Sequence, residues 1–380
     1  MLTVMQQFAA SRRTTNPYLI QLFDAVAGPV RSVNFSWRQA LLGRFDILHL
    51  HWPEVVCRSP SRPKTWVRRF VFLLVLLRIR WSRRALVRTL HNAAPHEAGG
   101  RIERWLLELC DRTTTVWIVL GEHTPVPVPN ATVLLIPHGD YRGWFSQYPR
   151  PEPESGRLLY FGLIRPYKGV DDLLAAFADT TDPDLRLRIA GQPAGSFLEP
   201  VIAAACRIDH RVSADLSYID DAQLADEVGR AELVVLPYRD LQNSGSLLLA
   251  LSLDRPVLVP DNAVTRQLAA EVGPGWVYTF TGRLAAGDLR TALRSIDRTA
   301  ERQRPNLDGR RWDVVGQAHV DAYELAARLT RDRRVLGQRS ADRFQVHRLA
   351  GPAEGELHPA PVAGGGVQRR LVASACERVH

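Results

Sequence analysis

The sequence predicts an α/β protein built from two successive domains, each with a parallel sheet. Short apolar segments alternate along the chain with amphipathic segments, as strands and helices do when helices cover both faces of a sheet. The alternation stops at the proline-rich, charged residues 149–156 and then restarts. The length of 380 residues suits two domains with a short addition.

Residues 1–148 are expected to form the first domain. Pro17 should open a helix, because proline suits the first helical position. Pro53 should end the strand before it, because proline cannot donate to a strand ladder. The expected strands are Leu2–Phe8, Asp46–His51, Arg84–Leu90, Thr114–Leu120 and Val133–Ile136, and the expected helices are Pro17–Ala27 and Arg101–Cys110.

Residues 149–156 are expected to form a linker, and residues 157–305 the second domain. The segment 306–330 should contain a helix, because Trp312–Arg328 carries apolar or small residues at helical spacing. The composition of residues 331–380 predicts disorder. The expected strands are Arg157–Gly162, Leu185–Ala190, Val212–Leu216, Leu233–Pro237 and Pro256–Val259, and the expected helices are Val170–Ala178, Pro200–Cys206, Asp221–Gly229 and Ser246–Ser252.

The composition argues against several classes of protein. The four cysteines lack CxxC spacing, which argues against a zinc site or a disulfide framework. No apolar run reaches the length of a membrane-spanning helix, and the N-terminus lacks the pattern of a secretory signal. No GxGxxG follows the first strand, which disfavours a dinucleotide oxidoreductase. We therefore expect a cytoplasmic protein.

A basic and apolar region stands out in the first domain. Ten basic residues and no acidic one lie between Val55 and His96, and the apolar run Phe70–Leu77 lies among them. This pattern favours attachment of Val55–Arg88 to an anionic membrane surface, where each basic residue contributes about 1 kcal/mol. A buried helix or strand with solvated arginine ends is the alternative. No recognition motif favours nucleic acid.

Two strand-to-helix turns in the second domain carry groups suited to phosphate. Arg165 and Lys168 lie between an expected strand and the helix that begins near Val170. Two cations beside a helix N-terminus suit a diphosphate, although exposed surface charges are the alternative. In the second turn, Asn243 or Ser244 can cap a helix and Gly245 permits close approach of a ligand. Capping and anion binding use the same geometry there.

These segments carry a family resemblance. YFGLIRPYKGVDDLLAAF and LVVLPYRDLQNSGSLLLALSLDRPVLVPD resemble the donor half of the GT-B nucleotide-sugar glycosyltransferases, which consist of two Rossmann-like domains with a cleft between them. TTNPY, LHLHWPE, TLHNAAPHE and IPHGDY resemble the acceptor half of a bacterial branch that assembles exopolysaccharides and glycolipids. Within it, the N-terminal motifs resemble GDP-mannose-dependent β-mannosyltransferases. The resemblance covers roughly residues 1–330.

The resemblance implies roles for particular residues. Arg165, Lys168 and the turn Asn243–Ser246 would bind the donor diphosphate, with no need for a metal or other cofactor. The terminal helix Trp312–Arg328 would cross back onto the first domain. The donor-binding candidates are Arg165, Lys168, Tyr238, Asn243, Ser244, Gly245, Ser246 and His138, and the acceptor-binding candidates are Thr15, Asn16, Glu54 and His91. Helix capping is the alternative for Thr15 and Asn16, and loop packing for His138.

One departure from the family bears on the reaction. Retaining members often carry two glutamates eight positions apart, and Leu241 and Leu249 stand at those places. An inverting displacement therefore becomes more plausible, and it needs one general base near the acceptor hydroxyl. The candidates for that base are Glu97, His96, His91, His51 and Glu54, and among them Glu97, His96 and His51 are preferred.

The expected function is transfer of a sugar from a nucleoside-diphosphate donor, such as GDP-mannose, to a lipid-linked or polysaccharide acceptor. Two alternatives stay open: a catalytically degenerate protein that binds sugar nucleotides, and a nucleotide-sugar epimerase on the same fold. The leucines at the two glutamate positions keep the first alternative open.

Overall fold

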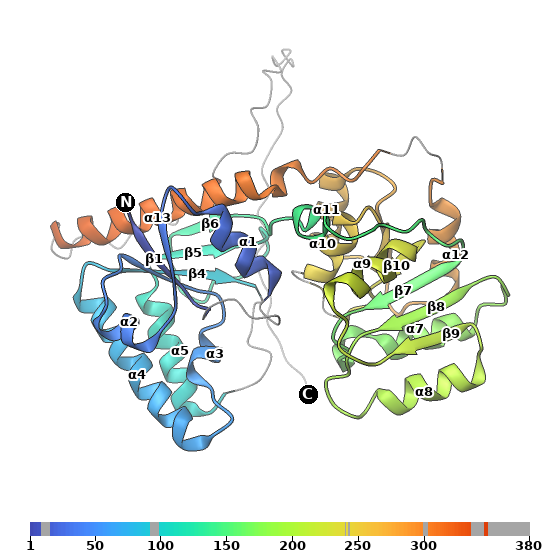
Figure 1. Ribbon diagram of the computed structural model, residues 1–380, viewed down its shortest axis with the longest axis horizontal. Helices are drawn as coiled ribbons and strands as arrows, with labels where there is room; N and C mark the ends of the chain where they lie inside the picture. Colours follow the sequence, from blue (N-terminus) through green and yellow to red (C-terminus); the bar gives the residue numbers. More distant parts are fainter. Residues whose placement is uncertain are drawn as a thin grey trace, which may run out of the picture. The chain divides into compact units, whose positions relative to one another are not determined.

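The computed structural model describes residues 1–8, 16–91, 99–239, 241, 244–298, 303–335 and 346–348. It contains two sheets in which every pair of neighbouring strands is parallel (Figure 1). Contacts place both sheets in one compact unit, Met1–Leu349. The expected α/β class is therefore confirmed. Within the described residues, no helix is both long enough and apolar enough to cross a membrane.

The first sheet has the strand order β13-β6-β5-β4-β3-β1-β2. Its strands carry apolar side chains on both faces, so that Ile47 faces one core and Leu48 the other. Helices therefore cover both sides. The elements are β1 (Thr3–Gln6), α1 (Pro17–Ala25), β2 (Arg31–Asn34), α2 (Trp37–Leu42), β3 (Ile47–Leu50), α3 (Pro53–Cys57), α4 (Arg62–Trp81), β4 (Ala85–Leu90), α5 (Arg101–Thr113), β5 (Val116–Val119), β6 (Val133–Leu135), α6 (Arg142–Phe145) and β13 (Val346–Arg348).

The second sheet has the order β12-β11-β10-β7-β8-β9. Its strands and the helices around them share one large core. Gly191 ends β8 in a conformation with φ of +146°, and an added Cβ would lie 2.1 Å from the carbonyl oxygen of Gly162. The elements are β7 (Arg157–Phe161), η1 (Pro166–Lys168), α7 (Val170–Ala178), β8 (Arg186–Ala190), α8 (Glu199–Ile208), β9 (Val212–Asp215), α9 (Asp221–Arg230), β10 (Leu233–Val235), α10 (Gly245–Ser252), β11 (Val257–Pro260), α11 (Ala263–Val272), β12 (Val277–Phe280), α12 (Ala286–Ser295) and η2 (Asp308–Arg310).

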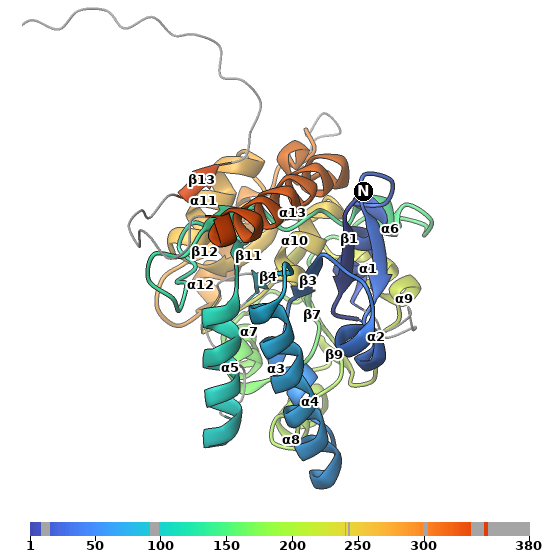
Figure 2. The ribbon, with the colours of Figure 1, turned by 90° about the vertical axis from the view of Figure 1, so that its left-hand side faces the viewer.

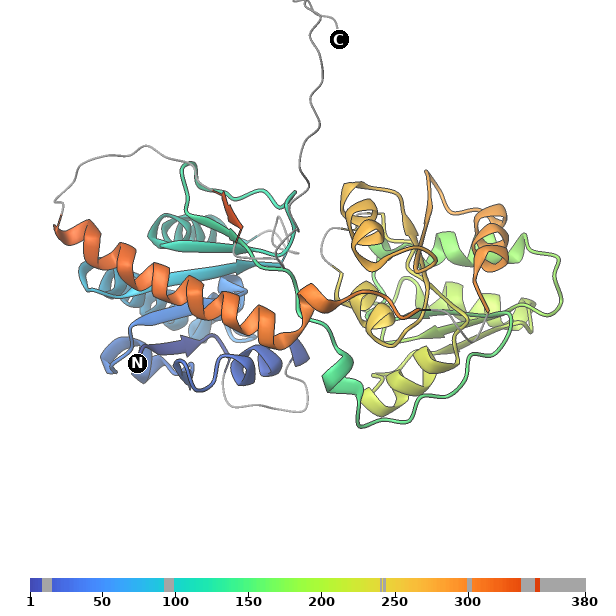
Figure 3. The same ribbon diagram turned by 90° about the horizontal axis from the view of Figure 1, so that it is seen from above.

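The terminal helix α13 (Trp312–Val335) packs on the first sheet, as Figure 3 shows. Its residues Val315, Ala322 and Tyr323 are buried in the same core as strands β1, β3 and β4. Gly316 permits close packing on α1, because an added Cβ would lie 2.7 Å from the carbonyl oxygen of Ala25. The helix begins at Trp312, as expected for Trp312–Arg328, and ends at Val335.

The structure decides one open alternative and adds elements that were not expected. The apolar run Phe70–Leu77 is helical and lies within the 20-residue helix α4. Strand β2 was not expected, because its four residues include only one apolar side chain. Helix α2, which follows it, was not expected either. Residues 331–335 of α13 and strand β13 lie in the tail 331–380 that was expected to be disordered, and the structure differs from that expectation for these residues. Strand β13 pairs in parallel with β6, which would otherwise be an edge strand.

Candidate active site

The loop after β7 presents two cations beside the second sheet. Arg165 precedes the single turn η1, and Lys168 ends it. Among the residues that the structure describes, neither side chain has a carboxylate partner within ion-pair distance. The Lys168 ammonium lies 4.8 Å from the ring centre of Tyr238. Burial lowers the pKa of Lys168, and the charge of Arg165 lowers it further, so a bound anion would relieve the repulsion between them.

The N-terminus of α10 lies beside these cations. The Ser244 hydroxyl caps the helix by accepting from the N–H of Leu247 at 3.2 Å. The N–H groups of Gly245 and Ser246 have no acceptor in the described part of the chain, and they carry the positive end of the helix dipole. Arg165, Lys168 and the N-terminus of α10 therefore form a positively charged site that can bind an anion.

Gly162 keeps open the space between these groups. Its φ is +105°, a conformation that side chains rarely adopt. An added Cβ would lie 3.4 Å from the Ser246 hydroxyl oxygen and 3.7 Å from the Lys168 nitrogen. We call the loop that carries Arg165 and Lys168 the cation loop. The end of β7, the cation loop and α10 thus converge at the carboxyl edge of the sheet, where α/β proteins bind ligands.

His138 and Tyr141 adjoin this point. The His138 ring donates from Nδ1 to the carbonyl oxygen of Gly139 at 2.7 Å, which leaves Nε2 as an acceptor 3.5 Å from the Tyr141 hydroxyl. That hydroxyl would lie 3.2 Å from a Cβ added at Gly245. The Tyr141 N–H donates to the hydroxyl of Ser252 at the other end of α10. Sequence reasoning missed Tyr141, although it directly follows the IPHGD segment.

Histidines gather at the carboxyl ends of strands β3 and β4 in the first sheet. His51 Nδ1 and His91 Nε2 lie 3.0 Å apart, so one donates to the other. The Nε2 atom of His51 is buried and has no hydrogen-bond partner among the residues that the structure describes. Gln7 fixes the turn, because its Oε1 accepts from the N–H groups of His51 and Trp52 at 2.5 and 2.7 Å.

The ring of Tyr18 connects the two groups of residues. Its centre lies 5.7 Å from His51, 5.1 Å from His91 and 4.5 Å from His138. Trp52 stacks on His91 at 4.4 Å. Burial lowers the pKa of His51 and His91 well below the ordinary histidine value, and that of His138 to about 4, so all three rings are neutral at pH 7. Neutral imidazoles can accept protons.

The other predicted site residues have mixed outcomes. Asn16 caps α1 by accepting from the N–H of Tyr18 at 3.0 Å, which fits the capping alternative. Glu54 is half-buried in the first turn of α3. Leu241 and Leu249 are buried in the second core, so no carboxylate stands at either place. Thr15, His96, Glu97 and Asn243 lie outside the described residues.

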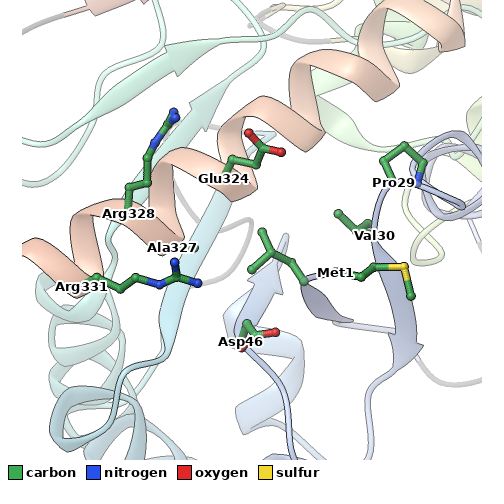
Figure 4. A pocket seen from close by; sticks show the side chains of 9 residues that line it. Met1, Pro29, Val30, Asp46, Glu324, Ala327, Arg328 and Arg331 are labelled. Carbon is green, nitrogen blue, oxygen red and sulfur yellow. The ribbon is translucent and has the colours of Figure 1, made fainter.

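A hollow of about 420 Å³ lies away from these groups (Figure 4). Met1 and Asp46, which line it, precede strands β1 and β3, so it is at the amino edge of the first sheet. Arg328 and Glu324 of α13 complete the lining. Because ligands of α/β sheets bind at the carboxyl edge, the hollow is not the candidate active site.

Helices α4 and α5 lie side by side (Figure 2). Both expose apolar side chains. We call the exposed apolar side chains of these two helices, taken together, the α4–α5 surface. Buried Glu103 of α5 joins the two helices, because it binds Arg69 of α4 at 2.7 Å and also Arg58. Arg78 donates to the carbonyl oxygens of Ala40 and Gly43. The exposed apolar residues of the surface are Trp66, Val67, Phe70, Leu74, Trp81, Ile102 and Trp105.

Comparison with known proteins finds close relatives and a shared fold. The chain is 44% identical over 322 residues to the GDP-mannose:glycolipid 4-beta-D-mannosyltransferase of Xanthomonas campestris pv. campestris, which covers 85% of this chain and 92% of the relative. The protein of that name from strain ATCC 33913 matches over the same share at the same identity. No family model matches the sequence.

Two solved structures share the fold. Anabaena HepE in complex with UDP gives a TM-score of 0.51 at 13% identity, and the match covers 88% of this chain and 99% of that one. Sucrose-phosphate synthase from Thermosynechococcus elongatus gives 0.51 at 15% identity, with 88% and 98% covered. At such identities the likeness concerns the fold alone.

Proposed function

The chain belongs to the GT-B nucleotide-sugar glycosyltransferases, and from this premise we propose that it transfers mannose from GDP-mannose to a glycolipid. One observation carries the proposal: Lys168 and Ser246, in the first turn of α10, meet beside Gly162, and Arg165 lies close enough to Lys168 to lower its pKa. This arrangement suits the diphosphate of a nucleotide sugar. The curated relative is named for the same donor and for a glycolipid acceptor.

The cation loop would act on the leaving group. When the bond between the sugar C1 and the phosphate oxygen breaks, negative charge develops on the nucleoside diphosphate. Arg165, Lys168 and the α10 dipole would stabilise that charge, which is the task a metal performs in other transferases. We therefore propose that the reaction needs no metal.

We propose that the anomeric configuration inverts. Leu241 and Leu249 supply no carboxylate at the places of the two family glutamates. The relative's name describes a β-linked product, whereas the sugar of GDP-mannose is α-linked to its diphosphate. In the single displacement, the acceptor oxygen would bond to C1, the diphosphate would leave, and one base would take the hydroxyl proton.

Glu97, His96 and His51 remain the proposed candidates for that base. His51 has structural support, because its buried Nε2 has no partner in the described part of the chain, while its Nδ1 atom pairs with His91. Its lowered pKa keeps the ring neutral and able to accept a proton at pH 7. Glu97 and His96 follow the same strand end as His91.

We propose that the protein attaches peripherally to the inner face of the cell membrane through Val55–Arg88. The α4–α5 surface supports this, because Trp66, Phe70 and Trp81 are more than half exposed. Arg62, Lys64, Arg80 and Arg83 are exposed around it, without an ion-pair partner in the described chain. Apolar side chains flanked by free cations suit an anionic bilayer, which also holds the lipid acceptor.

Transfer to a defined acceptor tests the proposed function. Purified protein, a polyprenyl-diphosphate oligosaccharide and either GDP-mannose or UDP-sugars would be incubated, and the lipid product analysed by mass spectrometry. We expect a mass increase of one hexose with GDP-mannose, lost when Arg165 and Lys168 are both changed to Ala. Arg290→Ala, an exposed arginine of α12, is the matched control. GDP binding without transfer to any lipid acceptor would favour the degenerate alternative, and conversion of the donor without acceptor would favour the epimerase.

A further inference from the structure

Two acidic residues lie beside the proposed diphosphate site. Asp171 and Asp172 occupy the first turn of α7, within four positions of Lys168. A carboxylate close to an anion repels it and competes for nearby cations. Without a partner, these two side chains would therefore oppose binding of a donor at the adjacent loop.

Arg239, which follows β10, binds both carboxylates. Its Nη2 lies 2.7 Å from Asp171 Oδ2 and 2.8 Å from Asp172 Oδ2, and its Nε lies 3.1 Å from the latter oxygen. Arg283 binds the other oxygen of Asp172 at 2.6 Å. Burial alone would raise the pKa of Asp172, but hydrogen bonds from both arginines lower it below its ordinary value. Asp172 is therefore ionised and paired.

The same arginine also contacts the cation loop. Its Nη1 donates to the carbonyl oxygen of Pro166 at 2.8 Å, and its backbone N–H donates to the carbonyl oxygen of Tyr167 at 2.8 Å. Gly169 lets this loop close on β10, because an added Cβ would lie 2.1 Å from the carbonyl oxygen of Pro237. Arg239 is thus attached to the loop that carries Arg165 and Lys168.

The charges around the loop divide into two groups. In the first group, the positive charges of Arg239 and Arg283 balance the negative charges of Asp171 and Asp172, so the group is neutral. Arg165 and Lys168 have no carboxylate partner in the described part of the chain, so this group keeps two positive charges. Two positive side chains can form charge-assisted hydrogen bonds with the two phosphates of a diphosphate.

We propose that Arg239 is a positioning residue for the donor: it neutralises Asp171 and Asp172, so that Arg165 and Lys168 remain available to the diphosphate. Arg239 acts through these carboxylates and does not contact the donor. The inference rests on the proposed function, since it names the group that controls the charge of the same site.

A charge-rescue series tests the proposal. Binding of GDP, UDP and inorganic pyrophosphate would be measured by calorimetry, and KM and kcat with GDP-mannose. We expect Arg239→Ala to raise the Kd of GDP about tenfold, with a larger change in KM than in kcat. Adding Asp171→Asn and Asp172→Asn should return the Kd to within about threefold of the native value. Arg239→Lys, which keeps the charge, should bind almost as well as the native protein.

The controls separate this proposal from others. Arg290→Ala should leave the Kd unchanged, and thermal melting would show that each variant is folded. If Arg239→Ala binds GDP like the native protein, or if the folded triple variant binds no better than Arg239→Ala, the proposal is overturned. If the native protein transfers no mannose but the series behaves as expected, the positioning role stands and the proposed function falls. If the native protein binds none of the three ligands, both fall.

Discussion

The Nδ1 atom of His49 lies 2.9 Å from the hydroxyl oxygen of Tyr323, although 274 residues separate them. The same hydroxyl accepts from the side-chain amide of Gln6 at 3.0 Å. The other ring nitrogen of His49, Nε2, forms a hydrogen bond with the hydroxyl of Thr89, 2.8 Å away. This buried chain of hydrogen bonds joins α13 to strands β1, β3 and β4.

Tyr323→Phe should therefore destabilise the protein. The change would leave the amide of Gln6 and the Nδ1 atom of His49 buried without this partner, at a cost of about 1–3 kcal/mol. Chemical denaturation would measure the loss. Tyr278→Phe is the matched control, because the Tyr278 hydroxyl donates to Ser295 at the surface and should contribute less. Equal stability of both variants would contradict this reading of the network.

The buried histidines predict that stability falls at mildly acidic pH. Burial lowers the pKa of His319 from 6.5 to about 4, so between these values the unfolded chain binds a proton that the folded chain does not. The free energy of unfolding should then decrease as the pH falls, by roughly 2 kcal/mol from His319 alone between pH 7 and pH 5. Denaturation curves at several pH values would show this. A constant stability over that range would contradict it.

Loss of the general base should slow the chemical step and leave binding of the donor nearly unchanged. Glu97→Gln, His96→Asn and His51→Asn would be compared, and we expect the variant that lacks the base to lower kcat by roughly 10²–10⁴-fold with little change in the KM of the donor. The pair with His91 makes His51 the candidate that the structure supports. Full activity of all three variants would exclude every proposed base.

Membrane attachment should depend on the free cations around the α4–α5 surface. Changing Arg62, Lys64, Arg80 and Arg83 together to Glu should abolish co-sedimentation with anionic vesicles, because each residue contributes about 1 kcal/mol. Arg290→Glu with Arg294→Glu, on exposed positions of α12, is the control. Arg69 and Arg78 are unsuitable, since both are used inside the fold. Unchanged binding of the fourfold variant would contradict the proposed attachment.

The sequence predicts local features better than distant contacts. Short apolar runs indicate most strands, and Arg165 with Lys168 marks the donor loop because both precede a helix. No local pattern indicates that Tyr323 reaches His49, because the bond joins opposite ends of the chain. The pairing of Arg239 with Asp171 likewise depends on how β10 and α7 come together.

The extent of the α4–α5 surface also escaped the sequence. The basic run Val55–Arg88 points to α4, but Trp105 lies on the next helix, in a segment with ordinary charge. In the sequence, Arg69 and Arg78 are two members of the basic run and have no visible partner. In the structure, Arg69 binds Glu103 and Arg78 binds the carbonyl oxygen of Gly43, and only tertiary packing brings these partners near.

The most direct test of the account is a thermal-shift series of nucleoside diphosphates on the native protein and on the double variant Arg165→Ala with Lys168→Ala. A ligand at 100 times its Kd adds about 2.7 kcal/mol to stability. We predict that GDP and GDP-mannose raise the melting temperature of the native protein, and that the double variant loses the shift. An equal shift in both proteins would contradict the proposed diphosphate site.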